Sequence, residues 1–395
     1  MLRVETFNRQ ESWKQFLDTS NPQSFLQDFE WGEVEKQLGR EVIRVGIYDE
    51  QNHKSKIPEI DKVNFRAESK LCSLSAKSQN DNSKIKINQE TNELELVGVC
   101  QVIGYQAKRG NFLLIPHGPI LNISRIAEIA VLQKLIEFLK NNNYHRRYTF
   151  LRLNSASPDD ENILAGLKKI GFKLAPIWTV ADNAWVKDLR QSETELLNEM
   201  QASSRKAVLT AMAKPFLEIE STADLNKFDQ FWKIYQALAK RKEFTPYAYE
   251  SIKKEFEIFL AADSSGLNAD LRGQPKARLY LGKVEGRYVC GALIIFSHKT
   301  AFYHHGASLP VKEPISHKMH WQITLEAKNL GCDYYNLWGL IASTQLGHPW
   351  SGLTQFKKGF GGRLIEFLPA LDYPFSQKYW LSYLIEKWRR KIKRL

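Results

Sequence analysis

The 395-residue sequence contains only four cysteines, and their positions exclude a cysteine-based scaffold. Cys72, Cys100, Cys290 and Cys332 are widely separated and show none of the paired spacings of a disulfide framework. Scattered cysteines of this kind are typical of a reducing compartment. We therefore expect a cytoplasmic protein.

Long apolar segments are also absent. No apolar run approaches the ~20 residues that cross a bilayer as a helix, and residues 1–23 lack the apolar core of a signal peptide. We expect no membrane span, and peripheral contact with the inner face of a membrane stays open.

What the sequence does have is positive charge, with a net charge of +12. Such an excess favours a polyanionic partner, either nucleic acid or an anionic membrane surface, although solvated lysines alone give the same balance.

The chain length predicts two domains, because one hydrophobic core rarely grows to this size. Alternating helix and strand patterns indicate an α/β protein. The segment from about residue 52 to 92 is dominated by Lys, Ser, Asn and Gln, which predicts a flexible insertion. Helices are expected at 8–20, 24–38, 124–140, 158–170, 191–212, 224–240, 247–262 and 317–329, and strands at 41–48, 94–105, 112–115, 148–153, 278–284, 288–296, 300–304 and 334–338.

The two halves of the chain repeat one order of elements. In each half, a strand ending at a glycine is followed by a helix, a further strand and a segment that contains Lys-Lys and Gly-Phe. The second of these segments runs from Phe356 to Phe360, and its counterpart from Leu167 to Phe172. This repetition predicts an internal duplication.

The most informative stretch is residues 336–362. A strand-like run ends at Gly339, a polar and aromatic loop follows, and then come Phe356, Lys357, Lys358 and a cluster of glycines. A lysine beside an aromatic ring and flexible glycines is suited to face an anionic substrate. We expect an exposed lysine here, whose contribution to the stability of the fold is small.

Five short segments, in this order and spacing, resemble the FemABX family of non-ribosomal peptidyl transferases. The resemblance spans most of the chain outside residues 52–92. The segments are Gln27-Asp28-Phe29-Glu30-Trp31, Ile115-Pro116-His117-Gly118-Pro119, Phe302-Tyr303-His304-His305-Gly306-Ala307-Ser308, Asn336-Leu337-Trp338-Gly339 and residues 352–362.

The resemblance implies two tandem GNAT-like acyltransferase domains, each a mixed sheet flanked by helices. It places residues 1–177 and 365–395 in the first domain and residues 178–364 in the second. It also implies transfer of an amino acid from aminoacyl-tRNA to the stem peptide of a UDP-linked or lipid-linked peptidoglycan precursor, in cell wall biogenesis. No heptad stretch is long enough for a helical arm, so the chain is similar to the shorter, armless, FemX-like members and is expected to be a monomer.

For catalysis, the resemblance implies Lys357 and Phe356. Lys357 matches the family's functional lysine and suits stabilisation of an oxyanion, while Phe356 could stack on the terminal adenosine of the tRNA. Without the resemblance, the two would be a surface lysine and a core phenylalanine. Arg205 and Lys206 are candidates for contacts with tRNA phosphates.

For precursor binding, the resemblance implies six residues: Lys36, Arg241, Tyr247, Tyr249, Tyr303 and His305. Three of the matches depart from the family pattern. A second family arginine falls near Tyr247, a family tyrosine falls on or beside His305, and a family lysine falls at Glu35, next to Lys36. These departures indicate a precursor or a binding geometry unlike that of the better-known members.

The histidines invite a metal-site interpretation that we do not adopt. His317 and His320 could share a helix face, and His304 and His305 are adjacent, but no acidic or thiolate residue has ligand spacing to them. We expect no metal, and no cofactor other than aminoacyl-tRNA as cosubstrate.

Two other functions remain open at this point. An acyl-CoA-dependent GNAT N-acyltransferase would carry Gln/Arg-x-x-Gly-x-Gly/Ala at a helix start, but the matching position here is Phe356. A non-catalytic RNA- or membrane-binding protein would also fit the positive charge. The basic tail around Lys387–Arg394, with Trp380, Tyr383, Leu384 and Trp388 before and within it, could contact tRNA or an anionic membrane, or be a solvated helix.

Overall fold

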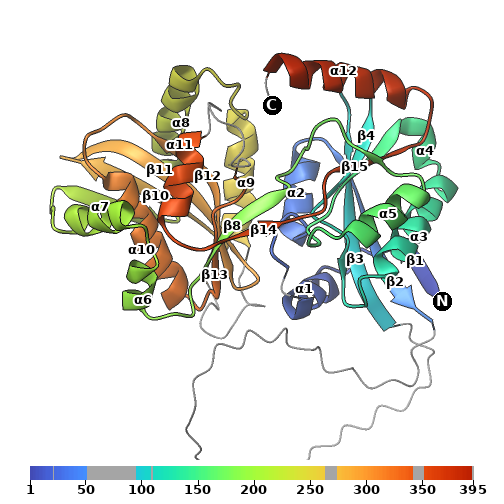
Figure 1. Cartoon of the computed structure of the whole chain (residues 1–395), viewed down its shortest axis with the longest axis horizontal. Coiled ribbons are helices and arrows are strands. Elements are labelled where there is room, and N and C mark those ends of the chain that lie inside the picture. Colours follow the sequence, from blue (N-terminus) through green and yellow to red (C-terminus); the bar gives the residue numbers. More distant parts are fainter. Residues whose placement is uncertain (21, 51–94, 108–109, 263–273, 341–350, 394–395) are drawn as a thin grey trace, which may run out of the picture.

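The structure is a computed structural model that describes residues 1–20, 22–50, 95–107, 110–262, 274–340 and 351–393. The expected insertion at 52–92 lies outside the described residues, as does most of the polar loop that follows Gly339. Two mixed sheets, each flanked by helices, stand side by side (Figure 1).

The first sheet contains four antiparallel strands followed by a parallel step from β4 to β6. The associated helices are α1 (Gln10–Ser20), α2 (Phe29–Gln37), α3 (Ala127–Asn141), α4 (Tyr144–Arg147), α5 (Glu161–Lys169) and α12 (Tyr379–Lys393). The strand order is β1 (Leu2–Thr6), β2 (Glu41–Asp49), β3 (Glu95–Tyr105), β4 (Phe112–Pro116), β6 (Phe150–Asn154), β15 (Leu371–Pro374) and β7 (Lys173–Leu174), with β5 (Ile120–Leu121) paired to β3.

The second sheet repeats this plan, with its parallel step between β12 and β13. Its helices are α6 (Glu193–Asn198), α7 (Ala202–Met212), α8 (Phe228–Lys242), α9 (Tyr249–Ala261), α10 (Ile315–Asn329) and α11 (Ser351–Gly359). Its strand order is β9 (Leu217–Thr222), β10 (Ala277–Val284), β11 (Arg287–Ser297), β12 (Thr300–Ser308), β13 (Tyr334–Asn336), β8 (Asn183–Asp188) and β14 (Arg363–Glu366).

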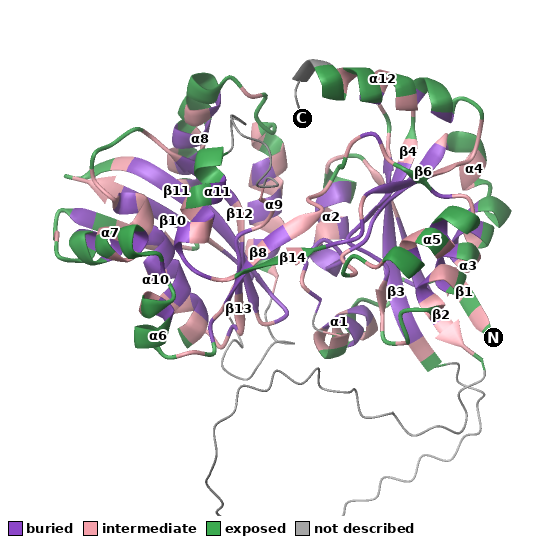
Figure 2. Cartoon of the chain, in the orientation of Figure 1, coloured by how far each residue is buried: buried purple, intermediate pink, exposed green. Residues whose placement is uncertain are grey.

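Both halves follow one chain order: a strand, two helices, three antiparallel strands, a crossover helix, a parallel strand, a helix and a strand. This order confirms the expected duplication and the expected pair of GNAT-like domains. The central strands are buried on both faces, as the purple strands of Figure 2 show. The crossover helix of the first half, α3, covers its sheet with a helical stripe that includes Val131, Leu135 and Leu139.

The two sheets exchange one strand each. β8 follows the first sheet in the chain but lies between β13 and β14 of the second sheet. β15 follows the second sheet in the chain but lies between β6 and β7 of the first sheet. The expected domain boundary near residue 177 falls between β7 and β8, and the one near residue 365 falls inside β14.

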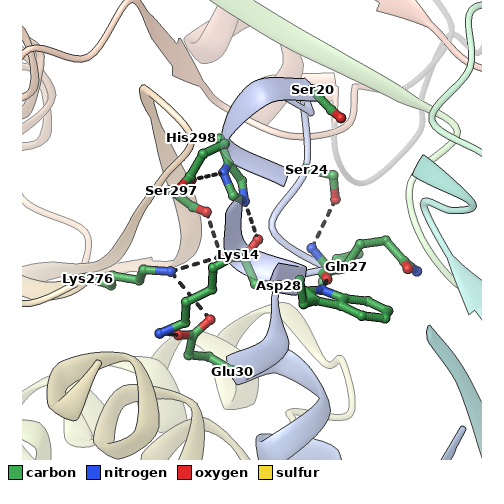
Figure 3. Close-up of polar contacts among 12 residues, drawn as sticks. Lys14, Ser20, Ser24, Gln27, Asp28, Glu30, Lys276, Ser297 and His298 are labelled. Carbon is green, nitrogen blue, oxygen red and sulfur yellow. Dashed lines mark hydrogen bonds and ion pairs between the residues drawn. The ribbon is translucent and has the colours of Figure 1, made fainter. Parts of the chain in front are cut away.

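A buried polar cluster joins the two domains (Figure 3). Asp28, which precedes α2, accepts hydrogen bonds from the Ser297 hydroxyl at 2.5 Å and from His298 Nε2 at 2.7 Å. Lys276 Nζ lies 3.6 Å from Asp28 and 3.4 Å from Glu30. Because these charges are buried, each one depends on its partners across the interface.

His298 occupies a strained position in this cluster. His298 and Lys299 have φ values of 47° and 59° in the two-residue turn between β11 and β12, where asparagine and glycine are usual. The second ring nitrogen of His298 lies 3.1 Å from Asp18. Although burial lowers the pKa of His298, Asp28 and Asp18 outweigh burial and raise the pKa from 6.5 to about 9.

This raised pKa gives a pH-dependent prediction. The protonated ring stabilises the fold fully below pH 6.5, and the stabilisation is lost as the pH rises through about 9. His298→Asn keeps a residue that tolerates positive φ, so it should lower the free energy of unfolding by about 3 kcal/mol at pH 6 and by much less at pH 9.5. Urea unfolding across this range would measure the difference. If the free energy of unfolding changed with pH in parallel for the two proteins, the raised pKa of His298 would be contradicted.

Candidate active site

Two neighbouring parallel strands separate at their carboxyl ends in the second domain. β12 pairs with β13 only from Thr300 to Phe302, yet β12 continues to Ser308. A register shift against β11 leaves His304 as an extra residue between Tyr303 and His305, which marks a β-bulge. The carboxyl ends of adjacent parallel strands are where α/β proteins commonly bind ligands. The candidate site is therefore built at this end of β12 and β13.

Lys357 reaches this end from α11. Its Nζ donates a hydrogen bond of 2.8 Å to the carbonyl of Gly339, three residues after β13. The preceding residue, Trp338, has a φ of 58°, and its N–H is held by the side chain of Asn336 at 2.8 Å. Burial lowers the pKa of Lys357 from 10.5 to about 7. The amine can therefore donate or accept a proton near neutral pH.

The expectation of an exposed Lys357 is wrong, because only 5% of the residue is exposed. α11 turns Thr354, Lys357 and Gly359 inward. Gly359 allows α11 to approach α7 closely, since a Cβ at this position would lie 2.2 Å from the Ser204 hydroxyl. The helix itself was not expected from the sequence, so the burial of one of its faces could not be foreseen.

Aromatic rings and histidines surround Lys357. The half-buried Phe356 meets the rings of His317, His320 and Phe360 edge-on, with centroids 5.1 to 5.2 Å away. Burial lowers the pKa of His320 to about 3, so the ring is neutral near pH 7, and its Nδ1 shares a hydrogen bond of 2.8 Å with the Tyr335 hydroxyl. These neighbours cover much of the Phe356 ring, and its stacking on the tRNA adenosine stays a prediction.

A second group of polar residues lies on the other face of β12. Nε2 of His305 and Nε2 of His304 lie 2.7 and 3.1 Å from the same carboxylate oxygen of Glu255, on α9. Although burial opposes the shift, His305 and His304 lower the pKa of Glu255 to about 2. The ring of Tyr247 lies 5.4 Å from that of His305. Tyr247 and His305 therefore form one wall, and their role in precursor binding stays a prediction.

The first domain faces this group through α2, which packs against α9. Glu35 on α2 pairs with Arg40 and accepts a hydrogen bond of 3.2 Å from the Tyr105 hydroxyl. Burial raises the pKa of Glu35, and the charge of Glu255 across the interface adds to the rise. Lys36 is exposed and pairs with Glu33 at 2.9 Å. At this interface the first domain thus presents Glu35, and not Lys36, to the second.

The other precursor-binding candidates point in different directions. Arg241 is exposed at the end of α8 and donates a hydrogen bond of 3.1 Å to the carbonyl of Ser308. The Tyr249 hydroxyl donates to Asp229 at 2.7 Å, so it is held against α8. The ring of Tyr303 packs 4.6 Å from that of His320 and belongs to the surroundings of Lys357.

The candidates for tRNA contact, Arg205 and Lys206, lie on α7, which contacts α11. Lys206 is exposed, and Arg205 is half-buried with a hydrogen bond of 3.4 Å to the carbonyl of Asn198. Positive charge therefore lies on the helix beside the one that carries Lys357.

Glu255 is the acidic partner that the sequence did not reveal. It lies 50 residues before His305, and no spacing rule connects the two positions. Among the described residues, Glu255, His304 and His305 are also the ones whose ligand atoms lie close enough for a metal, within 4.8 Å of one another. Both imidazoles are directed at one carboxylate oxygen, so the three side chains satisfy each other without an ion, and we assign no metal.

The comparisons with known proteins agree with this architecture. No curated protein matches the sequence. Residues 285–387 match the sequence model of the FemAB family. A crystal structure of FemX superimposes with a TM-score of 0.70 at 15% identity, covering 97% of this chain and 100% of that one. A conserved protein of unknown function from Bacteroides thetaiotaomicron VPI-5482 superimposes with a TM-score of 0.52 at 12% identity, covering 94% and 99%.

The two duplicated domains have a tandem GNAT-like fold. The likeness to FemX shows the shared fold, and the family match covers the segment that carries His304, His305 and Lys357.

Proposed function

We propose that the chain transfers an amino acid from aminoacyl-tRNA to an amine on the stem peptide of a peptidoglycan precursor, in the cytoplasm. The observation that carries this proposal is the buried amine of Lys357 at the separated ends of β12 and β13. The match of residues 285–387 to the FemAB family model supports it. All the residues proposed for the site come from one chain, so the proposed working unit is a monomer.

The reaction needs positioning and oxyanion stabilisation more than activation, because the aminoacyl ester is already reactive. The nitrogen of the acceptor amine attacks the carbonyl carbon of the ester and a C–N bond forms. The bond between that carbon and the ribose oxygen then breaks. The proton that the amine loses ends on the ribose hydroxyl. As an ammonium, Lys357 would donate to the oxyanion of the tetrahedral intermediate.

The acceptor side is proposed to lie at the domain interface. Arg241 is exposed and bonded to the carbonyl of Ser308, at the end of the strand that carries His305. A guanidinium at this position suits a phosphate of the precursor, because it can donate two parallel hydrogen bonds. The buried Glu255 and Glu35 bring negative charge to the same region, which suits an amine of the acceptor peptide.

The deciding experiment incubates the full-length protein with UDP-linked or lipid-linked precursors and a mixture of aminoacyl-tRNAs, followed by mass spectrometry of the precursors. A mass increase of one amino-acid residue supports the proposal and identifies the residue. Deacylated tRNA should give no product. An acetyl mass increase with acetyl-CoA, and none with charged tRNA, would replace the proposal by acyl-CoA-dependent transfer.

Binding of tRNA should depend strongly on salt. Contacts between basic side chains and phosphates release counterions, so the affinity falls as the salt concentration rises. Arg205→Gln combined with Lys206→Gln should weaken binding and reduce the slope of log K against log salt by roughly one to two. Filter binding at several salt concentrations would measure this slope.

A matched control is Lys168→Gln with Lys169→Gln, an exposed pair on α5 that removes the same charge from the first domain. This variant should keep the slope of the wild type. Equal slopes for the wild type and the α7 variant would remove α7 from the tRNA-binding surface.

A further inference from the structure

The C-terminal helix α12 carries a row of exposed apolar side chains. Trp380, Leu381, Leu384 and Trp388 are 45%, 66%, 61% and 64% exposed. At 100° per residue, their spacing gathers them in an arc of about 100° along one side of the helix. Large apolar side chains in a contiguous exposed row are typical of an interaction surface.

The opposite side of α12 is fixed to the first domain. Tyr379, Ser382 and Glu386 are buried there. Glu386 forms an ion pair of 2.7 Å with Arg152, and the Tyr379 hydroxyl donates to Asp372 at 3.3 Å. The helix therefore cannot rotate to bury its apolar row, and the row faces outward. Figure 1 shows α12 along the outer end of the first domain, the same end at which α8 connects to α9.

Basic side chains flank the apolar row on both sides. By helical geometry, Lys387 lies at one border of the row and Arg389 lies beyond the other. Lys391 lies in line with the row after Trp388, and Lys378 directly precedes the helix. All four are exposed or half-buried, whereas the acidic residue of the helix, Glu386, is buried and paired. The outward side of α12 is thus apolar in the middle and positive at its borders.

We propose that α12 docks on an anionic lipid bilayer, lying in the plane of the headgroups with Trp380, Leu381, Leu384 and Trp388 inserted. Tryptophans at both ends of the row suit the membrane–water interface. A basic amphipathic helix binds there through apolar burial together with attraction to anionic lipid. None of the described helices has the length and hydropathy of a membrane span, so this is contact with a surface. The binding does not depend on the proposed transfer reaction.

The test is flotation of the full-length protein with vesicles. Vesicles of phosphatidylcholine with about 30 mol% phosphatidylglycerol should bind the protein, and phosphatidylcholine alone should bind it weakly. Trp380→Ala with Trp388→Ala should lower partitioning by roughly 30-fold or more. Lys387→Gln with Lys391→Gln should lower partitioning by about 10- to 30-fold, and added salt should also lower partitioning.

The control variant is Leu209→Ala with Met212→Ala, two residues of α7 that are 54% and 48% exposed. It should bind vesicles like the wild type. Thermal unfolding without vesicles should be similar for all variants, because the replaced side chains are exposed.

Three results would overturn the proposal: no binding to anionic vesicles, equal binding of the tryptophan variant, or equal binding to both kinds of vesicle. Self-association that the tryptophan variant abolishes, without vesicle binding by the wild type, would show that a second copy of the chain covers the row.

Discussion

Lys357→Met is expected to slow amino acid transfer by roughly 10²–10³-fold, the usual effect of removing one oxyanion donor, without weakening the fold. Methionine fills a similar volume and carries no charge to bury. Because burial lowers the pKa of Lys357 to about 7, the unfolded chain binds more protons than the folded one between pH 7 and 10.5. The stability of the wild type should therefore rise with pH over this window relative to the variant. Single-turnover rates with saturating charged tRNA, and urea unfolding at several pH values, would measure both effects.

Two further variants make this test specific. Lys357→Arg should restore only part of the rate, because a planar guanidinium does not reproduce a compact amine. Lys358→Met is the control, since Lys358 lies over the ring of Trp185 at 5.8 Å, on a different side of α11. Equal rates for the wild type and Lys357→Met would remove Lys357 from the mechanism.

Arg152→Met is expected to lower the free energy of unfolding by about 3–5 kcal/mol, because it leaves buried carboxylates without a partner. Arg152 on β6 donates two hydrogen bonds, of 2.8 and 2.9 Å, to Asp372 on β15 and one of 2.7 Å to Glu386 on α12. Burial raises the pKa of Asp372, and Arg152 opposes that rise. Without the arginine, protonation of Asp372 becomes easier, so the loss should be smaller at pH 5 than at pH 7.5. Urea unfolding at both values would measure it.

The control for Arg152 is Arg147→Met, which breaks an ion pair of 2.8 Å with Glu41 whose side chains are 56% and 33% exposed. This change should lower the free energy of unfolding by less than about 1 kcal/mol. Adding Asp372→Asn and Glu386→Gln to Arg152→Met should recover much of the loss. A loss for Arg152→Met no larger than that for Arg147→Met would show that the buried pairs do not hold β15 and α12 in place.

Local periodicity predicted many of the helices and strands, but not where a helix is broken. The strand expected at 94–105 and the helix expected at 247–262 agree closely with β3 and α9. The single helix expected over 191–212 is instead two helices, α6 and α7. No glycine or proline marks the break; the N–H of Gln201 bonds to the carbonyl of Gly359, far along the chain. A break determined by a tertiary hydrogen bond leaves no trace in the local sequence.

In the candidate site, too, the sequence indicated individual residues but not their tertiary contacts. The Phe-Lys pair directed attention to Lys357, but its burial depends on how α11 packs, which periodicity did not reveal. The Glu255 cluster depends on the bulge at His304, which lets two consecutive histidines reach one carboxylate. In a regular strand they would point to opposite faces. The sequence showed the adjacent histidines, and only the register of β12 against β11 gives them a common partner.

The exchange of β8 and β15 has a consequence for the ancestry of the chain. If a single-domain ancestor paired its last strand with the sheet of a second copy, the product would be a symmetric dimer held by two reciprocal strands. Fusing the two genes end to start would give the connectivity seen here, with β8 in the second sheet and β15 in the first. The present chain then keeps inside one polypeptide what was once a contact between subunits. The duplicated halves were free to diverge in sequence, but neither could be lost without removing a strand that lies between two others in the other sheet.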